Sequence, residues 1–228
     1  MRPLVLIPGF MCDGRLFEPQ IRGLHKTHDV TIALPTERTI GDMAARILDD
    51  NPGEFALGGL SMGGIIALEM LRQAPDRITR LALMDTTPLA DAPANYEVRT
   101  RQIAEVHAGH LETIMRDELK PAYLVESREK TAILDLCMAM AKSLGPEVFE
   151  AQSLALRDRA DLQAALTHAP EHTLILHGAE DRLCPPERHH LMHRLAPHSR
   201  LVSIEKAGHL PTLERPFQTT AAIQNWLT

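Results

Sequence analysis

The chain has 228 residues, 44% of them hydrophobic, which predicts one globular domain large enough to carry an inserted subdomain. A net charge of −6 without a long basic run argues against nucleic acid or an anionic membrane surface as a partner. Three separated cysteines form no CxxC pair, and no apolar run reaches the length of a signal or membrane segment, which favours a cytoplasmic protein.

Strand-like and helix-like segments alternate along most of the chain. The pattern predicts strands at 3–9, 28–35, 54–61, 78–85, 172–178 and 199–205, and helices at 16–24, 39–50, 62–74, 186–196 and 216–227. From about Pro88 to His168 only helical patterns occur. We therefore expect an α/β fold in which a mostly parallel sheet of about six strands has helices on both faces. Its core would comprise residues 1–87 and 169–228, with a helical cap insertion at 88–168.

One serine stands at the junction of a predicted strand and a predicted helix. Ser61 lies in a G-x-S-x-G sequence, Gly59-Leu60-Ser61-Met62-Gly63. A sharp strand-to-helix turn needs glycines where side chains would collide, and it exposes the serine hydroxyl at the carboxyl end of the sheet. A glycine-rich turn with an incidental serine is the alternative, but the flanking strand and helix favour a catalytic nucleophile.

A serine nucleophile needs a base, and the base needs an acid that orients it. His209 follows the last predicted strand, so we expect it at the carboxyl edge of the sheet and favour it as the base. Asp181 follows the preceding strand and is the favoured acid; Asp85 is a second candidate, for which we favour a role in bracing the turn. His189 and His193 lie one helical turn apart, but no third metal ligand is evident, so a surface helix without metal is expected.

The segments LVLIPGF, GLSMGG, LALMDTTP, LILHGAEDRLCPP and KAGHLPTLERP resemble the α/β-hydrolase family, in particular its small cap-bearing esterases, enol-lactonases and thioesterases. The chain order Ser61, Asp181, His209 is that of the family. The resemblance implies these three as nucleophile, acid and base, and an oxyanion hole made by the backbone N–H groups of Phe10 and Met62. It implies no cofactor. Many members have His-Gly where this chain has Pro8-Gly9, but the donor needed is the next residue, Phe10.

The function expected from these features is hydrolysis of an ester, lactone or thioester of a small molecule through an acyl-enzyme. A carbon–carbon bond hydrolase, an aminopeptidase with acidic cap residues, and a non-catalytic ligand receptor stay open as alternatives. Within the predicted cap, Met138 and Met140 belong to an apolar stripe that is typical of core packing. The other interpretation, an acyl-binding wall, makes them candidate substrate-binding residues. The sequence leaves the oligomeric state open.

Overall fold

The computed structural model describes residues 2–228, which form one six-stranded sheet in the order β2-β1-β3-β4-β5-β6. Every neighbouring pair of strands is parallel, so the predicted α/β fold with a parallel sheet is confirmed. The strands are β1 (Arg2–Ile7), β2 (His28–Ile32), β3 (Phe55–Leu60), β4 (Ile78–Met84), β5 (Thr173–Gly178) and β6 (Arg200–Ile204).

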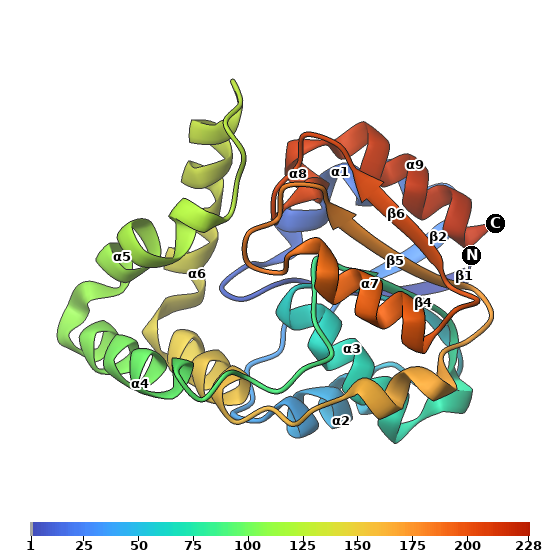
Figure 1. Ribbon diagram of the computed structural model, residues 1–228, viewed down its shortest axis with the longest axis horizontal. Coiled ribbons are helices and arrows are strands. Elements are labelled where there is room, and N and C mark those ends of the chain that lie inside the picture. Colours follow the sequence, from blue (N-terminus) through green and yellow to red (C-terminus); the bar gives the residue numbers. More distant parts are fainter. Residues whose placement is uncertain (1) are drawn as a thin grey trace.

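Both faces of the sheet are covered by helices, as Figure 1 shows. Successive residues of a strand point to opposite faces, so Val5 and Ile7 pack in one apolar cluster while Leu4 and Leu6 pack in another. The first cluster is closed by α2 (Ile40–Asp50), α3 (Met62–Gln73) and α7 (Pro186–Leu195), and the second by α1 (Glu18–Leu24) and α9 (Pro216–Leu227). Strands buried on both sides explain the continuous apolar runs in the sequence.

The chain between β4 and β5 is helical, and it projects beyond the arrowheads of β5 and β6 in Figure 1. It contributes Met115 and Phe149 to a small apolar cluster that also includes Met11 of the core. At its base, the amide of Leu162 donates to the carbonyl of Pro88 at 2.7 Å, so the outgoing and returning chains are joined. The elements of this part are α4 (Asn95–Glu105), η3 (Val106–His110), α5 (Leu111–Thr113), η4 (Ile114–Leu119), η5 (Lys120–Ala122), α6 (Lys130–Arg157) and η6 (Gln163–His168).

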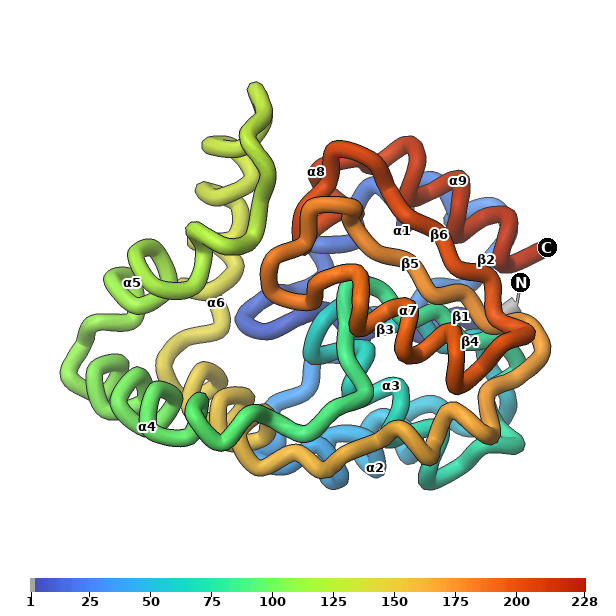
Figure 2. The backbone as a smooth tube through the Cα atoms, in the orientation of Figure 1, coloured from blue at the N-terminus to red at the C-terminus, as the bar shows by residue number. Residues whose placement is uncertain are grey.

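Figure 2 traces the backbone and shows that α9 ends at the side of the molecule away from this helical insertion. Three shorter elements complete the core: η1 (Gly14–Phe17), η2 (Pro75–Arg77) and α8 (Pro211–Glu214). The helix α6 bends at Gly145, where φ is 80°. Cys12, Cys137 and Cys184 are buried free thiols. Within residues 2–228, no helix has both the length and the apolar character that crossing a bilayer requires.

Candidate active site

Ser61 lies in a tight turn between β3 and α3, with a backbone conformation (φ 56°, ψ −116°) that side-chain-bearing residues rarely adopt. A Cβ atom on Gly59 would lie 2.1 Å from the carbonyl oxygen of Gly63, and one on Gly63 would lie 2.0 Å from the oxygen of Ile7. These contacts explain why glycine flanks the serine on both sides. The Ser61 amide donates to the carbonyl of Met84 at 2.9 Å, which fixes the turn against β4.

Ser61, His209 and Asp181 are joined by two hydrogen bonds. The distance from His209 Nε2 to Ser61 Oγ is 2.8 Å, and the distance from His209 Nδ1 to Asp181 Oδ2 is also 2.8 Å. A carboxylate can only accept, so Nδ1 carries the ring proton and Nε2 accepts from the serine hydroxyl. Asp181 follows β5 and His209 follows β6, so the carboxyl ends of neighbouring strands bring together residues that are distant in the sequence.

The two candidate acids, Asp181 and Asp85, are in opposite electrostatic states. Burial disfavours the charge of Asp181, but His209 and the amides of Leu183 and Cys184 offset this effect and hold its pKa below the usual range. Complete burial, together with the neighbouring charge of Asp181, raises the pKa of Asp85 well above the usual range. Asp85 accepts from the Gly178 amide at 2.8 Å, but it does not bond the imidazole. The geometry thus favours Asp181 as the partner of His209.

Two backbone amides next to Ser61 are free to bind an anion. Met62 is the first residue of α3, so its N–H has no acceptor within the helix. The amide of Phe10 likewise has no acceptor among residues 2–228, whereas that of its neighbour Met11 donates to Gln152 Oε1 at 2.9 Å. Phe10 and Met62 line the same cavity as Ser61, as an oxyanion hole would require.

A cavity of about 240 Å³ opens over the Ser61 hydroxyl. Its walls include Tyr123 and Leu156 and four polar residues that the sequence did not single out: Asp91, Asn95, Arg99 and Arg159. The regular spacing of Asp91, Asn95 and Arg99 at four-residue intervals could have signalled one helical face. Arg159 lies in a separate segment, and its sequence context carries no such signal.

Met138 and Met140 are not among the residues that line this cavity, so they do not form the expected acyl-binding wall. Met140 is completely buried in the apolar cluster on the α1 side of the sheet, and its sulfur accepts from the Asp13 amide at 3.4 Å. Met138 packs against the apolar cluster of the insertion. Both side chains therefore contribute to the core, which is the other role that the apolar stripe predicted.

The expected surface role of His189 is wrong. Its ring is completely buried and stacks on His177 with centroids 4.6 Å apart, and its Nε2 accepts from the Thr86 amide at 3.1 Å. His193 instead contacts Ser199 Oγ through Nδ1 at 2.9 Å. The two histidines are thus engaged in different hydrogen bonds rather than directed at a common ion.

Asp181, Cys184 and His209 offer ligand atoms that all lie within 4.8 Å of one another. A metal would need a thiolate, but burial raises the pKa of Cys184 well above the usual range and keeps the thiol protonated. Nδ1 of His209 is already bound to Asp181. This group of residues is therefore better suited to the hydrogen-bonded chain than to a cation.

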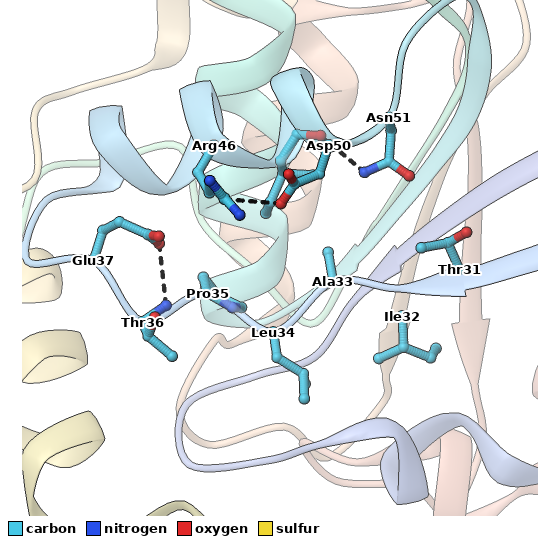
Figure 3. A pocket seen from close by; sticks show the side chains of 11 residues that line it. Thr31, Ile32, Ala33, Leu34, Pro35, Thr36, Glu37, Arg46, Asp50 and Asn51 are labelled. Carbon is cyan, nitrogen blue, oxygen red and sulfur yellow. Dashed lines mark hydrogen bonds and ion pairs between the residues drawn. The ribbon is translucent and has the colours of Figure 1, made fainter.

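A larger cavity, of about 430 Å³, lies between β2 and α2 (Figure 3). Four of the polar groups on its wall form two pairs of their own, Arg46 with Asp50 at 2.9 Å and the Thr36 amide with Glu37 Oε2 at 3.1 Å. None of the three hydrogen-bonded residues Ser61, His209 and Asp181 lines it. The smaller cavity is therefore the one that combines space with reactive groups.

Known proteins resemble this chain along nearly its whole length. A model of the Alpha/beta hydrolase family matches residues 4–223. Pimeloyl-[acyl-carrier protein] methyl ester esterases are similar to this chain. The esterase of Nitrosomonas europaea is 27% identical over 79% of this chain and 74% of its own length. The esterase of Xanthomonas oryzae pv. oryzae is 25% identical over 98% of this chain and 94% of its own length. A solved thermophilic esterase from Thermogutta terrifontis with bound malate is 31% identical, with a TM-score of 0.89, over 100% of this chain and 89% of that one. The enol-lactonase from Burkholderia xenovorans LB400, 20% identical over 99% and 91% with a TM-score of 0.86, shares the fold.

Proposed function

Because the chain belongs to the α/β-hydrolase family and is an enzyme that acts on ester bonds, we propose that it cleaves a small carboxylic ester through a Ser61–His209–Asp181 triad. The observation that carries the proposal is the pair of 2.8 Å hydrogen bonds that joins these residues beside a cavity lined by Ser61 and His209. Lactones and thioesters present the same acyl carbon and belong to the same substrate class.

In the first half of the reaction, Ser61 Oγ attacks the acyl carbon while its proton passes to His209 Nε2. The negative charge that develops on the carbonyl oxygen is bound by the amides of Phe10 and Met62. When the intermediate collapses, the bond to the leaving oxygen breaks and the imidazolium gives its proton to that oxygen. Each oxyanion donor accounts for about 10²–10³ in rate, and the general base for about 10²–10⁴.

In the second half, water attacks the acyl-enzyme and gives a proton to His209 Nε2. Collapse of the second tetrahedral intermediate releases the acid and returns that proton to Ser61. Throughout, the Asp181 carboxylate accepts the hydrogen bond from the Nδ1–H group of His209 and stabilises the imidazolium. Asp85, with its raised pKa, stays neutral beside it and braces the turn after β4 through the Gly178 amide.

Four acidic residues of the insertion offer little support for an aminopeptidase, and Asp91, the acidic residue that does line the cavity, is already paired with Arg99 and Arg159. Glu105, Glu112, Asp117 and Glu118 are each paired with a cationic or titratable side chain near the surface, and none of them lines the cavity over Ser61. We propose that residues 88–168 act as a cap on a core of residues 1–87 and 169–228, because Arg99 and Tyr123 of this segment help to enclose that cavity. The buried free thiols are consistent with a cytoplasmic location.

The test is covalent labelling with a fluorophosphonate probe, followed by kinetics on p-nitrophenyl esters from acetate to decanoate beside lactones and acyl thioesters. Ser61→Ala should abolish labelling and lower kcat on the order of 10⁴–10⁶. Ser203→Ala, an exposed serine on β6, is the matched control and should label and turn over as the parent does. Labelling that persists in Ser61→Ala would exclude Ser61 as the nucleophile. A protein that labels and binds ligands but turns over no substrate would support the receptor alternative.

A further inference from the structure

A cluster of two arginines and one aspartate forms part of the wall of the Ser61 cavity. Arg99 is on α4, Arg159 follows α6, and Asp91 precedes α4. Their side chains are 19%, 9% and 4% exposed, respectively. Such burial is unusual for charged residues, and it requires that each charge find a partner.

The hydrogen bonds of the two arginines differ. Arg159 uses all three of its nitrogens: Nε donates to Leu89 O at 3.0 Å, Nη1 donates to Leu156 O at 2.9 Å, and Nη2 pairs with Asp91 Oδ1 at 3.2 Å. Arg99 uses Nε alone, which donates to Asp91 Oδ2 at 2.6 Å. Neither Nη group of Arg99 has a hydrogen-bond partner in the part of the chain that the structure describes. Arg159 therefore fixes the cluster, while Arg99 keeps most of its donors available.

The cluster also carries an excess positive charge. Although burial disfavours its charge, Asp91 is kept ionised by Asn95 and Arg99, which lower its pKa. One carboxylate thus faces two guanidinium groups. Of the other lining residues, Cys184 and Tyr123 have pKa values raised by burial and stay neutral, and His209 is engaged with Asp181. The wall is thus left with about one uncompensated positive charge.

We propose that Arg99 binds a carboxylate on the substrate, so that this enzyme acts on esters whose acyl or alcohol part carries a second, ionised acid group. A guanidinium Nη pair matches a carboxylate in a two-pronged geometry, and the charge of the ligand would neutralise the wall. Tyr123 lines the same cavity, and its neutral hydroxyl, which has no hydrogen-bond partner within residues 2–228, is a second donor. The cavity volume of about 240 Å³ restricts the substrate to a small acid.

This inference rests on the proposed function, since it assumes that the cavity over Ser61 receives the substrate. The kinetic test compares mono-p-nitrophenyl glutarate with the neutral p-nitrophenyl hexanoate, in Arg99→Gln and in Arg101→Gln. Arg101 lies on the same helix but outside the cavity, where it pairs with Glu118. Arg99→Gln should lower kcat/KM for the glutarate ester by about 10–100-fold, mainly through KM, and change that for the hexanoate ester less than twofold. Arg101→Gln should leave both unchanged.

Equal losses on the two esters, or no loss on the glutarate ester, would overturn the proposal. Arg99→Lys controls for misfolding, because lysine keeps the positive charge but lacks the paired Nη donors of the guanidinium. Its kcat/KM for the glutarate ester should lie between those of the parent and Arg99→Gln, while its kcat/KM for the hexanoate ester should equal that of the parent. Glutarate binding to Ser61→Ala, measured by calorimetry, separates this inference from the proposed function. If glutarate binds to Ser61→Ala and the further substitution Arg99→Gln removes this binding, the anion site is supported even if no ester is hydrolysed. Hydrolysis of the neutral ester without glutarate binding would leave the triad intact and refute the anion site.

Discussion

The buried His189 makes the stability of this protein depend on pH. Its Nε2 accepts from the Thr86 amide, and Thr86 Oγ1 in turn donates to the carbonyl oxygen of Ser61 at 2.6 Å. Burial, and secondarily the neighbouring His177, lowers the pKa of His189 from 6.5 to about 3. A proton on Nε2 would remove the acceptor that holds Thr86, so acid should act on a residue that directly supports the nucleophile turn.

The magnitude follows from proton linkage. The folded-state pKa is depressed, so the unfolded chain binds a proton at His189 more readily, and stability is lost as pH falls from 6.5 toward about 3. Between pH 7 and pH 5 this single group should cost about 2 kcal/mol of unfolding free energy, at about 1.4 kcal/mol per unit below 6.5. His189→Gln keeps an oxygen that can accept from Thr86 but does not titrate in this range. It should therefore lose about 2 kcal/mol less than the parent over the same interval.

The assay is urea unfolding at pH 7 and pH 5, followed by the fluorescence of Trp226, the one tryptophan of the sequence, which is buried in the core. Other groups also titrate, so the informative quantity is the difference between the variant and the parent. His168→Gln, at an exposed position, is the control and should follow the parent. If the free energies of the parent and His189→Gln fall by equal amounts, the ring of His189 is not held neutral in the fold.

Three further predictions concern the site and its surroundings. Asp181→Asn should reduce kcat on the order of 10⁴ by removing the partner that orients the imidazole, whereas Asp85→Asn should cost little activity; steady-state kinetics giving the reverse order would make Asp85 the acid. Burial raises the pKa of Asp85 in the folded state, so the stability that its neutral form contributes is complete below the unfolded value of about 3.8 and is lost as pH rises toward the folded-state pKa; Asp85→Asn should therefore raise the melting temperature at pH 8 more than at pH 4. Met140→Ala should lower the unfolding free energy by about 2–5 kcal/mol and leave the preferred ester chain length unchanged. A shifted chain-length optimum would place Met140 at the substrate.

The features that could be predicted from the sequence are those whose signal is local. The turn around Ser61 needs glycines within two residues of it, and His209 and Asp181 each follow a strand of a parallel sheet, whose carboxyl ends meet at one edge. The role of Met140 could not be predicted in this way, because helical spacing shows that one face is buried but not what covers it. The burial of His189 depends on His177, which lies on a different element.

The cluster of Asp91, Arg99 and Arg159 could not be predicted for a related reason. Asp91 and Arg99 lie in one segment, but Arg159 is brought to them only by the return of the chain through α6. Two arginines and an aspartate in a charged sequence are typical of a solvated surface. Their burial together is a property of the tertiary fold, and no spacing of residues along the chain specifies it.

The hydrogen bond between Leu162 and Pro88 has a consequence for how this enzyme could be re-engineered. The strands that precede and follow the insertion, β4 and β5, are direct neighbours, with Ala82 opposite Leu174, so the core itself holds the two junctions close together. A foreign segment whose ends meet at these junctions would leave the strand register untouched, and a longer one would add little to the entropy of loop closure. Arg99 would leave with the exchanged segment while Ser61 and His209 stayed behind. The new segment would also have to replace the Tyr123 carbonyl that accepts from the His209 amide at 2.7 Å, so an exchange of substrate preference between relatives must preserve that contact.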